Sequence, residues 1–289
     1  MAKSRFEYVR SFESFDACLL NSWIVVRLDG RNFHRFSDHH QFAKPNDDQA
    51  LALMARCAKN VMKDFNDIIL SYGQSDEFSF VFRRETEVFQ RRSSKLLSTV
   101  VSLFTSSYVF FWSNHFSNTP LQYPPTFDGR IVLYPTDKNL RDYLSWRQAD
   151  CHINNLHNTA YWKLVSEAGM SPNDAQTKLG KMLANDKNEM LFSQFNTNYN
   201  NIPELFRKGT VLVREPQQSQ LKKHDELKKD DSKMNGDDQD TKVITNSDSL
   251  AIKDKQIFYK NKSTIINMLN TDIIGNKFWS ERPYLLTSE

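Results

Sequence analysis

The residues Trp23-Ile-Val-Val-Arg-Leu-Asp-Gly30 are β-branched or apolar for most of their length and predict a buried strand. The strand stops at the glycine, directly after Asp29. We expect Arg31 to Ser37 to form a loop. A helix is predicted after Pro45, because Asn46 can cap it and apolar residues then recur at helical spacing. These apolar residues are Leu51, Met54, Ala55, Ala58, Val61, Met62 and Phe65.

A hairpin and a second helix with its strand are expected next. Residues 67–72 and 78–82 are two apolar runs joined by a short polar turn, which predicts the hairpin. A long helix from about Glu87 to Trp112 and a strand at Arg130 to Tyr134 follow. The first 135 residues therefore predict the order βαββαβ, the split-βαβ arrangement of ferredoxin-like domains.

Two acidic residues are expected to meet in this topology. Asp29 ends the first strand and Asp76 lies in the turn before the third, and these two strands pair at the centre of the predicted sheet. Their carboxylates, with the Gly30 carbonyl, suit two divalent ions that clamp the oxygens of a phosphoryl or nucleotidyl transfer. Glu77 is either a neighbour of this metal shell or a residue that points outward. Taken singly, each acid is more often a solvated residue at a strand end than a ligand, and Gly30 can simply turn the chain.

Several cations are expected around the two acids, where they would neutralise a triphosphate. These cations are Arg27, Arg31, His34, Arg35, Lys44, Arg92 and Lys95. No G-x-x-x-x-G-K-[ST] motif occurs, so the chain has no P-loop. Phe33, Ser75 and the backbone amides after Gly30 are the candidates for holding base and triphosphate.

The chain beyond residue 135 is expected to be mostly helical. Helices are predicted at about Leu140 to Cys151, Asn158 to Glu167 and Lys187 to Phe195, with a further helix start capped at Ser171 and a strand at Gly209 to Val213. We therefore expect a helical extension over residues 136–215, packed on a catalytic domain of residues 1–135.

The polar run Cys151-His-Ile-Asn-Asn-Leu-His-Asn-Thr159 is the second group of candidate site residues. Its amide and imidazole groups, followed by Tyr161 and Trp162, suit contacts with single-stranded or terminal nucleotides. His152 and His157 are five residues apart, which does not fit a helical zinc pair. A hydrogen-bonded network that joins two segments of the protein explains the same residues equally well.

The C-terminal quarter differs in composition. Residues 207–257 contain no Phe, Tyr or Trp and include a dense run of charges, which predicts a disordered insertion at about residues 216–255. The remaining residues, 256–289, include Ile273-Ile-Gly-Asn-Lys-Phe-Trp279. This segment either docks back onto the fold or forms a loose end.

Composition narrows the class of protein. The 38 Lys and Arg nearly balance the 35 Asp and Glu, so a nucleic-acid surface would have to be local. Three scattered cysteines predict reduced thiols, and a charged N-terminus argues against secretion. Leu96 to Trp112 is apolar but interrupted by hydroxyl residues and shorter than the ~20 residues of a membrane span. We expect a buried helix there, no membrane span, and a cytoplasmic protein.

Five motifs follow one another in an order that is similar to the tRNA-His guanylyltransferase family. They are Asp29-Gly-Arg-Asn-Phe-His-Arg-Phe36, Lys44-Pro-Asn-Asp47, Tyr72-Gly-Gln-Ser-Asp-Glu77, Ser145-Trp-Arg-Gln-Ala-Asp-Cys-His-Ile-Asn-Asn-Leu156 and Asp186-Lys-Asn-Glu189. The similarity runs from Lys3 to about Val213 and returns at Asp272 to Trp279. It implies an α+β fold with a palm-like catalytic core, in agreement with the predicted βαββαβ order.

The resemblance also implies a reaction. ATP would adenylylate the 5′-phosphate of tRNA-His, the 3′-hydroxyl of GTP would displace AMP, and pyrophosphate would then be removed. One guanylate is thereby added in the 3′–5′ direction, with two Mg²⁺ ions per active site. Members of the family assemble as homotetramers, and a mitochondrial pool beside the cytoplasmic one is also expected.

The resemblance assigns roles residue by residue. Asp29, the Gly30 carbonyl and Asp76 would hold the metal ions, with Glu77 as a third catalytic residue that supports them. The residues implied to contact nucleotide are Asp29, Gly30, Arg31, Asn32, Phe33, His34, Lys44, Ser75, Asp76, Arg92 and Lys95. Those implied to contact tRNA are His152, Asn154, Asn155 and Lys187.

Two departures and three alternatives stay open. His157 stands where the family has Tyr, and the 216–255 insertion is not a general family feature, which leaves fine tRNA selectivity and regulation undecided. A palm-type nucleotidyl cyclase would use the same acid pair without RNA. A non-catalytic RNA-binding adaptor would use the polar run alone. Template-directed repair of truncated tRNA would use the same chemistry as single-guanylate addition.

Overall fold

A six-stranded antiparallel sheet organises the molecule. The computed structural model describes residues 4–216 and 264–286. The strand order is β4-β1-β3-β2-β5-β6, so β1 and β3 are neighbours. The α+β class and the split-βαβ order of the first four strands are confirmed. The strands are β1 (Trp23–Gly30), β2 (Ile68–Gln74), β3 (Glu77–Phe82), β4 (Phe127–Tyr134), β5 (Thr210–Pro216) and β6 (Thr264–Leu269).

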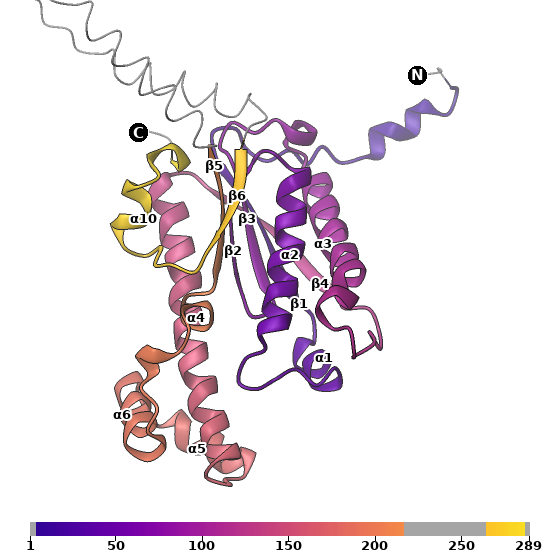
Figure 1. The fold of residues 1–289 in the computed structure, drawn as a ribbon. Coiled ribbons are helices and arrows are strands. Elements are labelled where there is room, and N and C mark those ends of the chain that lie inside the picture. The colour runs from indigo at the N-terminus through magenta and orange to yellow at the C-terminus, as the bar shows by residue number, and fades with distance from the viewer. Residues whose placement is uncertain (1–3, 217–263, 287–289) are drawn as a thin grey trace, which may run out of the picture.

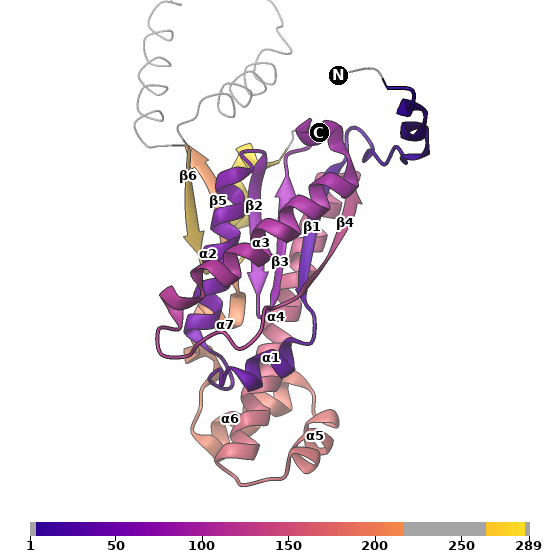
Figure 2. The ribbon, with the colours of Figure 1, turned by 90° about the vertical axis from the view of Figure 1, so that its right-hand side faces the viewer.

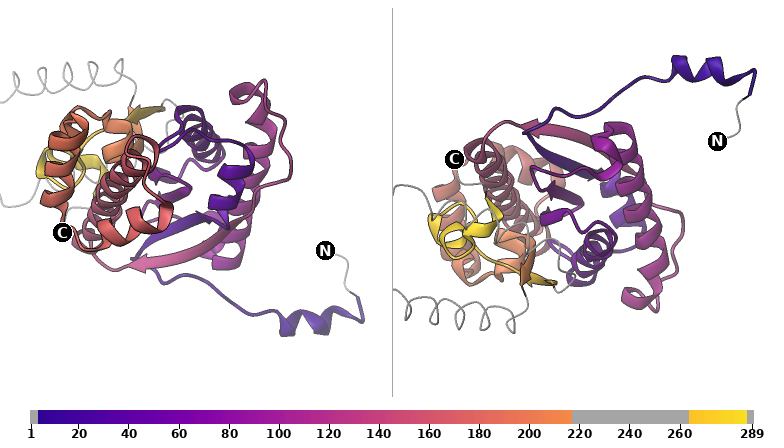
Figure 3. Two further views of the ribbon diagram at one scale, coloured as in Figure 1. Left: turned by 90° about the horizontal axis from the view of Figure 1, so that it is seen from below. Right: turned by 90° about the horizontal axis from the view of Figure 1, so that it is seen from above.

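Helices cover both faces of this sheet (Figure 1). α2 (Asp48–Asp64) and α3 (Ser93–His115) lie on one face, where they enclose the larger apolar cluster with every second residue of β3. α4 (Asp137–Ser166) lies on the other face with α10 (Asn276–Ser280). The views along the strands in Figure 3 show the sheet between these two layers.

α3 is long and apolar enough to cross a membrane by length and composition, and among the described residues it is the only such helix. Packing accounts for the apolar character of one side of this helix. Leu96, Val100, Phe104, Tyr108 and Trp112 are buried in the cluster between α2, α3 and the sheet. Other apolar residues of α3, such as Phe110, are exposed.

Two sequence predictions on the helices were wrong. Residues 31–37, expected to be a loop, contain the start of α1 (Phe33–His39), because Phe33 and Phe36 lie on one side of a short helix and both pack into the core. The two helices predicted at 140–151 and 158–167 are one continuous helix, α4. Its polar middle residues interrupt the apolar periodicity without breaking the backbone hydrogen bonds.

A small helical module lies beyond one end of the sheet (Figure 2). α5 (Pro172–Gly180) begins where the Ser171 hydroxyl accepts a hydrogen bond from the Asp174 amide. α5 and α6 (Ala184–Phe195) pack with the second half of α4 around a separate apolar cluster that includes Leu156, Leu164 and Leu191. α7 (Glu204–Lys208) then leads the chain back to the sheet.

Segments beyond residue 135 complete the sheet as well as the helical layer. β5 pairs with β2, and β6 pairs with β5. Phe278 and Trp279 are buried against α4, and the Trp279 indole donates a hydrogen bond to the Ile273 carbonyl. The predicted insertion lies outside the described residues from residue 217 onward. Within residues 4–216 and 264–286 there are also four short 3₁₀ helices: Glu7–Phe12, Val88–Arg91, Tyr199–Asn201 and Pro283–Leu285.

Candidate active site

The two central strands bring Asp29 and Asp76 to the same end of the sheet. Asp29 pairs in register with Glu77, and the Gly30 amide donates a hydrogen bond to the Asp76 carbonyl over 3.1 Å. A two-residue turn, Ser75 and Asp76, joins β2 to β3. Ser75 has a φ of 49°, a left-handed conformation that a serine seldom adopts and that is typical of functional turns.

Gly30 leaves the space in which the Asp76 carboxylate sits. A Cβ atom at Gly30 would lie 2.7 Å from the Asp76 Oδ2 atom and 2.3 Å from the Phe33 ring. Any larger residue would therefore displace the carboxylate or the ring. The close approach of the backbone to a carboxylate fits a site that uses the Gly30 carbonyl and Asp76 together.

The end of the sheet that carries Asp29 and Asp76, called the acidic end below, has the electrostatics of a cation site. The Asp76 side chain is half-buried, and burial, with a smaller contribution from the negative charge of Asp29, raises its pKa. His34 and the Ser75 hydroxyl oppose that shift. Among the described residues, no cluster of three or more His, Cys, Asp or Glu side chains could hold a metal. Two carboxylates and one carbonyl nevertheless suffice for Mg²⁺, which keeps several waters.

A buried charge network links the acids to α4. Arg27 donates to Asp29 over 2.8 Å and also to Glu77, and the Arg147 guanidinium donates to Glu77 over 3.1 Å. Arg147 is only 3% exposed and stacks on the Trp146 ring, 3.4 Å from its centroid. Burial raises the pKa of Glu77, and the charges of both arginines oppose this shift. Arg147 lies in a motif that carried the resemblance, but its contact with Glu77 was not predicted.

The nucleotide candidates after Gly30 are divided between surface and core. His34 is exposed, and Asn32 begins α1 with a φ of 56°. Phe33 is 9% exposed and stacks on Phe36 at 4.8 Å, so its ring belongs to the core, with one edge against Gly30. Lys44 forms an ion pair with Asp38 at 2.8 Å.

Arg92 and Lys95 do not lie near the acids within one chain. α3 begins beside the residues that precede β1, where Ala17 pairs with Arg92, whereas Asp29 pairs with Glu77 at the other end of the sheet. Five residues of strand separate these ends by about 17 Å. The expectation that topology places both cations beside the acids was therefore wrong for a single chain. Arg92 instead forms an ion pair with Asp16.

The tRNA candidates lie on α4 and α6. His152 and Asn154 are exposed, and Lys187 is half-buried. Asn155 is 5% exposed, accepts a hydrogen bond from Asn46 and donates one to the Tyr199 hydroxyl. This side chain therefore joins α4 to the loop before α2, as the network interpretation of the polar run expected.

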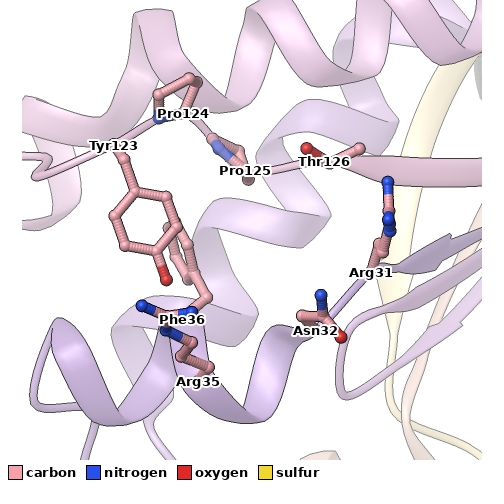
Figure 4. Close-up of a pocket in the computed structure, with 8 residues that line it drawn as sticks. All are labelled: Arg31, Asn32, Arg35, Phe36, Tyr123, Pro124, Pro125 and Thr126. Carbon is pink, nitrogen blue, oxygen red and sulfur yellow. The ribbon is translucent and has the colours of Figure 1, made fainter.

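A pocket of about 350 Å³ lies beside the acidic end, between α1 and the loop that leads into β4. Figure 4 shows Arg35 on α1 and Arg31 just before this helix. Tyr123, Pro124 and Pro125 of the loop lie across from them. The lining residues are Arg31, Asn32, Arg35, Phe36, Tyr123, Pro124, Pro125 and Thr126.

A split-βαβ sheet with two acids meeting at one end of its central strands is the arrangement expected of a palm-type nucleotidyltransferase. The model of the family described as tRNAHis guanylyltransferase matches residues 6–135, and the model of the Thg1 C terminal domain matches residues 138–275. The chain therefore belongs to the tRNAHis guanylyltransferase family, and it is an enzyme of the nucleotidyltransferase class.

Individual relatives agree with this assignment. The chain is 50% identical to "Probable tRNA(His) guanylyltransferase" of Mus musculus over all of its own length and 90% of the relative. It superimposes on the crystal structure of tRNA(His) guanylyltransferase from Saccharomyces cerevisiae with a TM-score of 0.70 and 47% identity, covering 72% of this chain and 93% of that one. A bacterial guanylyltransferase-like protein in complex with ATP, 23% identical with a TM-score of 0.60 over 72% and 85% of the two chains, shares the fold.

Proposed function

We propose that this chain adds one guanylate to the 5′ end of tRNA-His. The observation that carries the proposal is the meeting of Asp29 and Asp76 beside the Gly30 backbone, in a fold whose relatives are named tRNA(His) guanylyltransferases. The substrates proposed with this activity are ATP, GTP and 5′-phosphorylated tRNA-His.

The reaction proceeds in three steps. An oxygen of the tRNA 5′-phosphate attacks the α-phosphorus of ATP and releases pyrophosphate. The 3′-hydroxyl of GTP then attacks the activated 5′-phosphorus and releases AMP. Removal of pyrophosphate from the new 5′ end leaves one added guanylate.

Asp29, Asp76 and the Gly30 carbonyl are the groups that would hold two Mg²⁺ ions. When bound, magnesium supplies charge neutralisation at the attacking and leaving oxygens. Arg27 keeps the Asp29 carboxylate oriented through its 2.8 Å contact, and Glu77 is in turn held by Arg147. Glu77 therefore supports Asp29 through Arg27, the arginine that both carboxylates share.

Exposed groups around the acids bind the substrates in this proposal. The backbone from Gly30 to His34, with Ser75 and Lys44, contacts nucleotide, while His152, Asn154 and Lys187 face tRNA from α4 and α6. Asn155 acts through the hydrogen bonds that fix α4 to the loop before α2.

Assembly of four copies is part of the proposal. The resemblance implies that Arg92 and Lys95 contact phosphate, and the start of α3 at the opposite end of the sheet would then require an acidic end from another copy. A cytoplasmic location with a mitochondrial pool stays a prediction.

A labelled-GTP assay tests the function. Full-length protein with 5′-monophosphorylated tRNA-His, ATP and Mg²⁺ is expected to yield a labelled tRNA longer by one nucleotide. A tRNA with another anticodon is the control substrate. Conversion of GTP or ATP to a cyclic nucleotide without RNA would identify a cyclase, and magnesium-independent tRNA binding without transfer would identify an adaptor.

A further inference from the structure

The pocket beside α1 has a wall that is held in place by a buried histidine. The Gln122 amide donates to His40 Nε2 over 3.0 Å, and His40 Nδ1 lies 2.8 Å from the Phe36 carbonyl. Since Nε2 accepts, Nδ1 must carry the proton and donate to that carbonyl. His40 is 2% exposed, so the loop from Gln122 to Thr126 is fixed to α1 from below.

The ring of Tyr123 packs against the same part of α1 and against His40. It makes edge contacts with Phe36 at 5.5 Å and lies 5.4 Å from the His40 ring, yet it stays 37% exposed toward the pocket. At the other end of the loop, the Thr126 carbonyl accepts a hydrogen bond from the Arg31 amide over 2.8 Å. The pocket is therefore bounded by fixed backbone on one side and by one exposed aromatic face.

The pocket is positively charged. Arg31 and Arg35 are exposed, and neither forms an ion pair with any residue in the parts of the chain that the structure describes. In Figure 4, Arg31 lies next to Thr126 and Arg35 lies below Tyr123. Guanidinium groups without a carboxylate partner and an exposed aromatic face are the features that recognise phosphate and base.

We propose that this pocket binds one nucleotide of the RNA strand whose 5′ end is modified, with backbone phosphates at Arg31 and Arg35 and the base against Tyr123. The proposal deepens the proposed function and rests on it for the identity of the RNA. The volume of about 350 Å³ is at the lower end of ligand pockets and suits one nucleotide. Arg31 directly follows Gly30, so a strand in this pocket lies next to the acids.

A free nucleoside triphosphate offers the same groups to the pocket, a base and phosphates. The distribution of charge favours the strand, because a nucleotide within RNA has a phosphate on each side, whereas a free triphosphate carries all of its charge at one end. Cations at both the Thr126 end and the Tyr123 end fit the first pattern.

The test changes Arg35 and Tyr123 and leaves Arg31 intact because it adjoins Gly30. In full-length protein without ATP or GTP, the Kd for 5′-monophosphorylated tRNA-His is measured at several salt concentrations. Arg35→Gln is expected to lower the salt slope by about 0.7, the value for one phosphate of a single strand. Tyr123→Leu is expected to raise the Kd about tenfold with little change in slope.

Arg56→Gln is the matched control, since Arg56 is exposed on α2 and stacks on Phe111 away from the pocket. It should bind tRNA like the parent. Direct binding of ATP and GTP by equilibrium dialysis should be the same for all variants, and melting temperatures exclude misfolding.

Two results would overturn the pocket proposal: unchanged tRNA binding in both pocket variants, or a loss confined to ATP or GTP, which would assign the pocket to free nucleotide. Failure of the proposed function is seen separately. If the parent transfers no label, guanylate addition is contradicted. If tRNA binding nevertheless falls in both pocket variants, the pocket is still supported as a site for the RNA strand.

Discussion

The two faces of β3 differ in their side chains: one is entirely aromatic, and the other includes Glu77 and Ser79 beside Val81. Phe78, Phe80 and Phe82 point toward α2 and α3, where Phe80 lies 6.1 Å from Phe104 in a purely apolar cluster. Ser79 on the other face bonds the Tyr143 hydroxyl over 2.7 Å, and Glu77 meets two arginines. The aromatic face packs the strand against α2 and α3, while the other face places Glu77 and its two arginine partners at the acidic end.

Loss of an acid should produce the largest effect and leave both faces intact. Asp29→Ala and Asp76→Ala are each expected to reduce label transfer on the order of a thousand-fold or more, because the cation loses a ligand at the reacting phosphate. The melting temperature should stay near that of the parent. Asp142→Ala, at an exposed aspartate on α4, is the control and should transfer normally. Normal transfer by either acid variant would remove that residue from the metal site.

A cavity in the aromatic face should act on stability alone. Phe80→Ala is expected to lower the free energy of unfolding by about 3–5 kcal/mol, measured by urea denaturation. Transfer per folded molecule should persist well below the melting temperature. Phe110→Ala, 76% exposed on α3, should change stability by less than about 0.5 kcal/mol. A large loss of turnover in folded Phe80→Ala protein would contradict the view that the aromatic face of β3 serves stability and not catalysis.

A change in the polar face should affect activity and stability together. Arg147→Met is expected to slow transfer about 10–100-fold, because Glu77 loses a partner that orients it. The unfolding free energy should fall by about 1–3 kcal/mol.

The double variant Glu77→Gln with Arg147→Met separates the two effects. It should regain stability, since no buried charge is left without its partner, but it should not regain activity. Recovery of both would show that the network serves folding only.

The smallest expected effect concerns His40, which packs on the aromatic side against Trp112 at 4.9 Å. Burial lowers its pKa in the folded protein, so the unfolded chain binds the proton more readily. The stability contributed by the neutral ring is present above the unfolded pKa of about 6.5 and falls as the pH drops below it. Urea midpoints between pH 7.5 and 5.5 should decline less in His40→Gln. An identical decline would exclude His40 as the source.

Sequence periodicity predicted the central strands because their apolar runs are long and end at clear turn signals. The same topology rule that pairs the first and third strands brought Asp29 and Asp76 to one end of the sheet. The same rule makes α3 start where β3 ends, opposite the turn that holds Asp76, so the placement of Arg92 and Lys95 beside the acids did not follow from the topology. Arg147 was missed because a buried arginine on a helix has the same sequence pattern as a solvated one. Only the fold shows that Glu77 on β3 is its partner.

The unbroken course of α4 fixes a length. Its 30 residues extend about 45 Å, and its first half packs on the sheet while its second half supports α5 and α6. One inserted residue would shift the distal module by about 1.5 Å and rotate it by about 100°. The spacing between the sheet and that module can therefore evolve only in steps close to whole helical turns. The length of α4 thus sets how far α5 and α6 lie from the sheet.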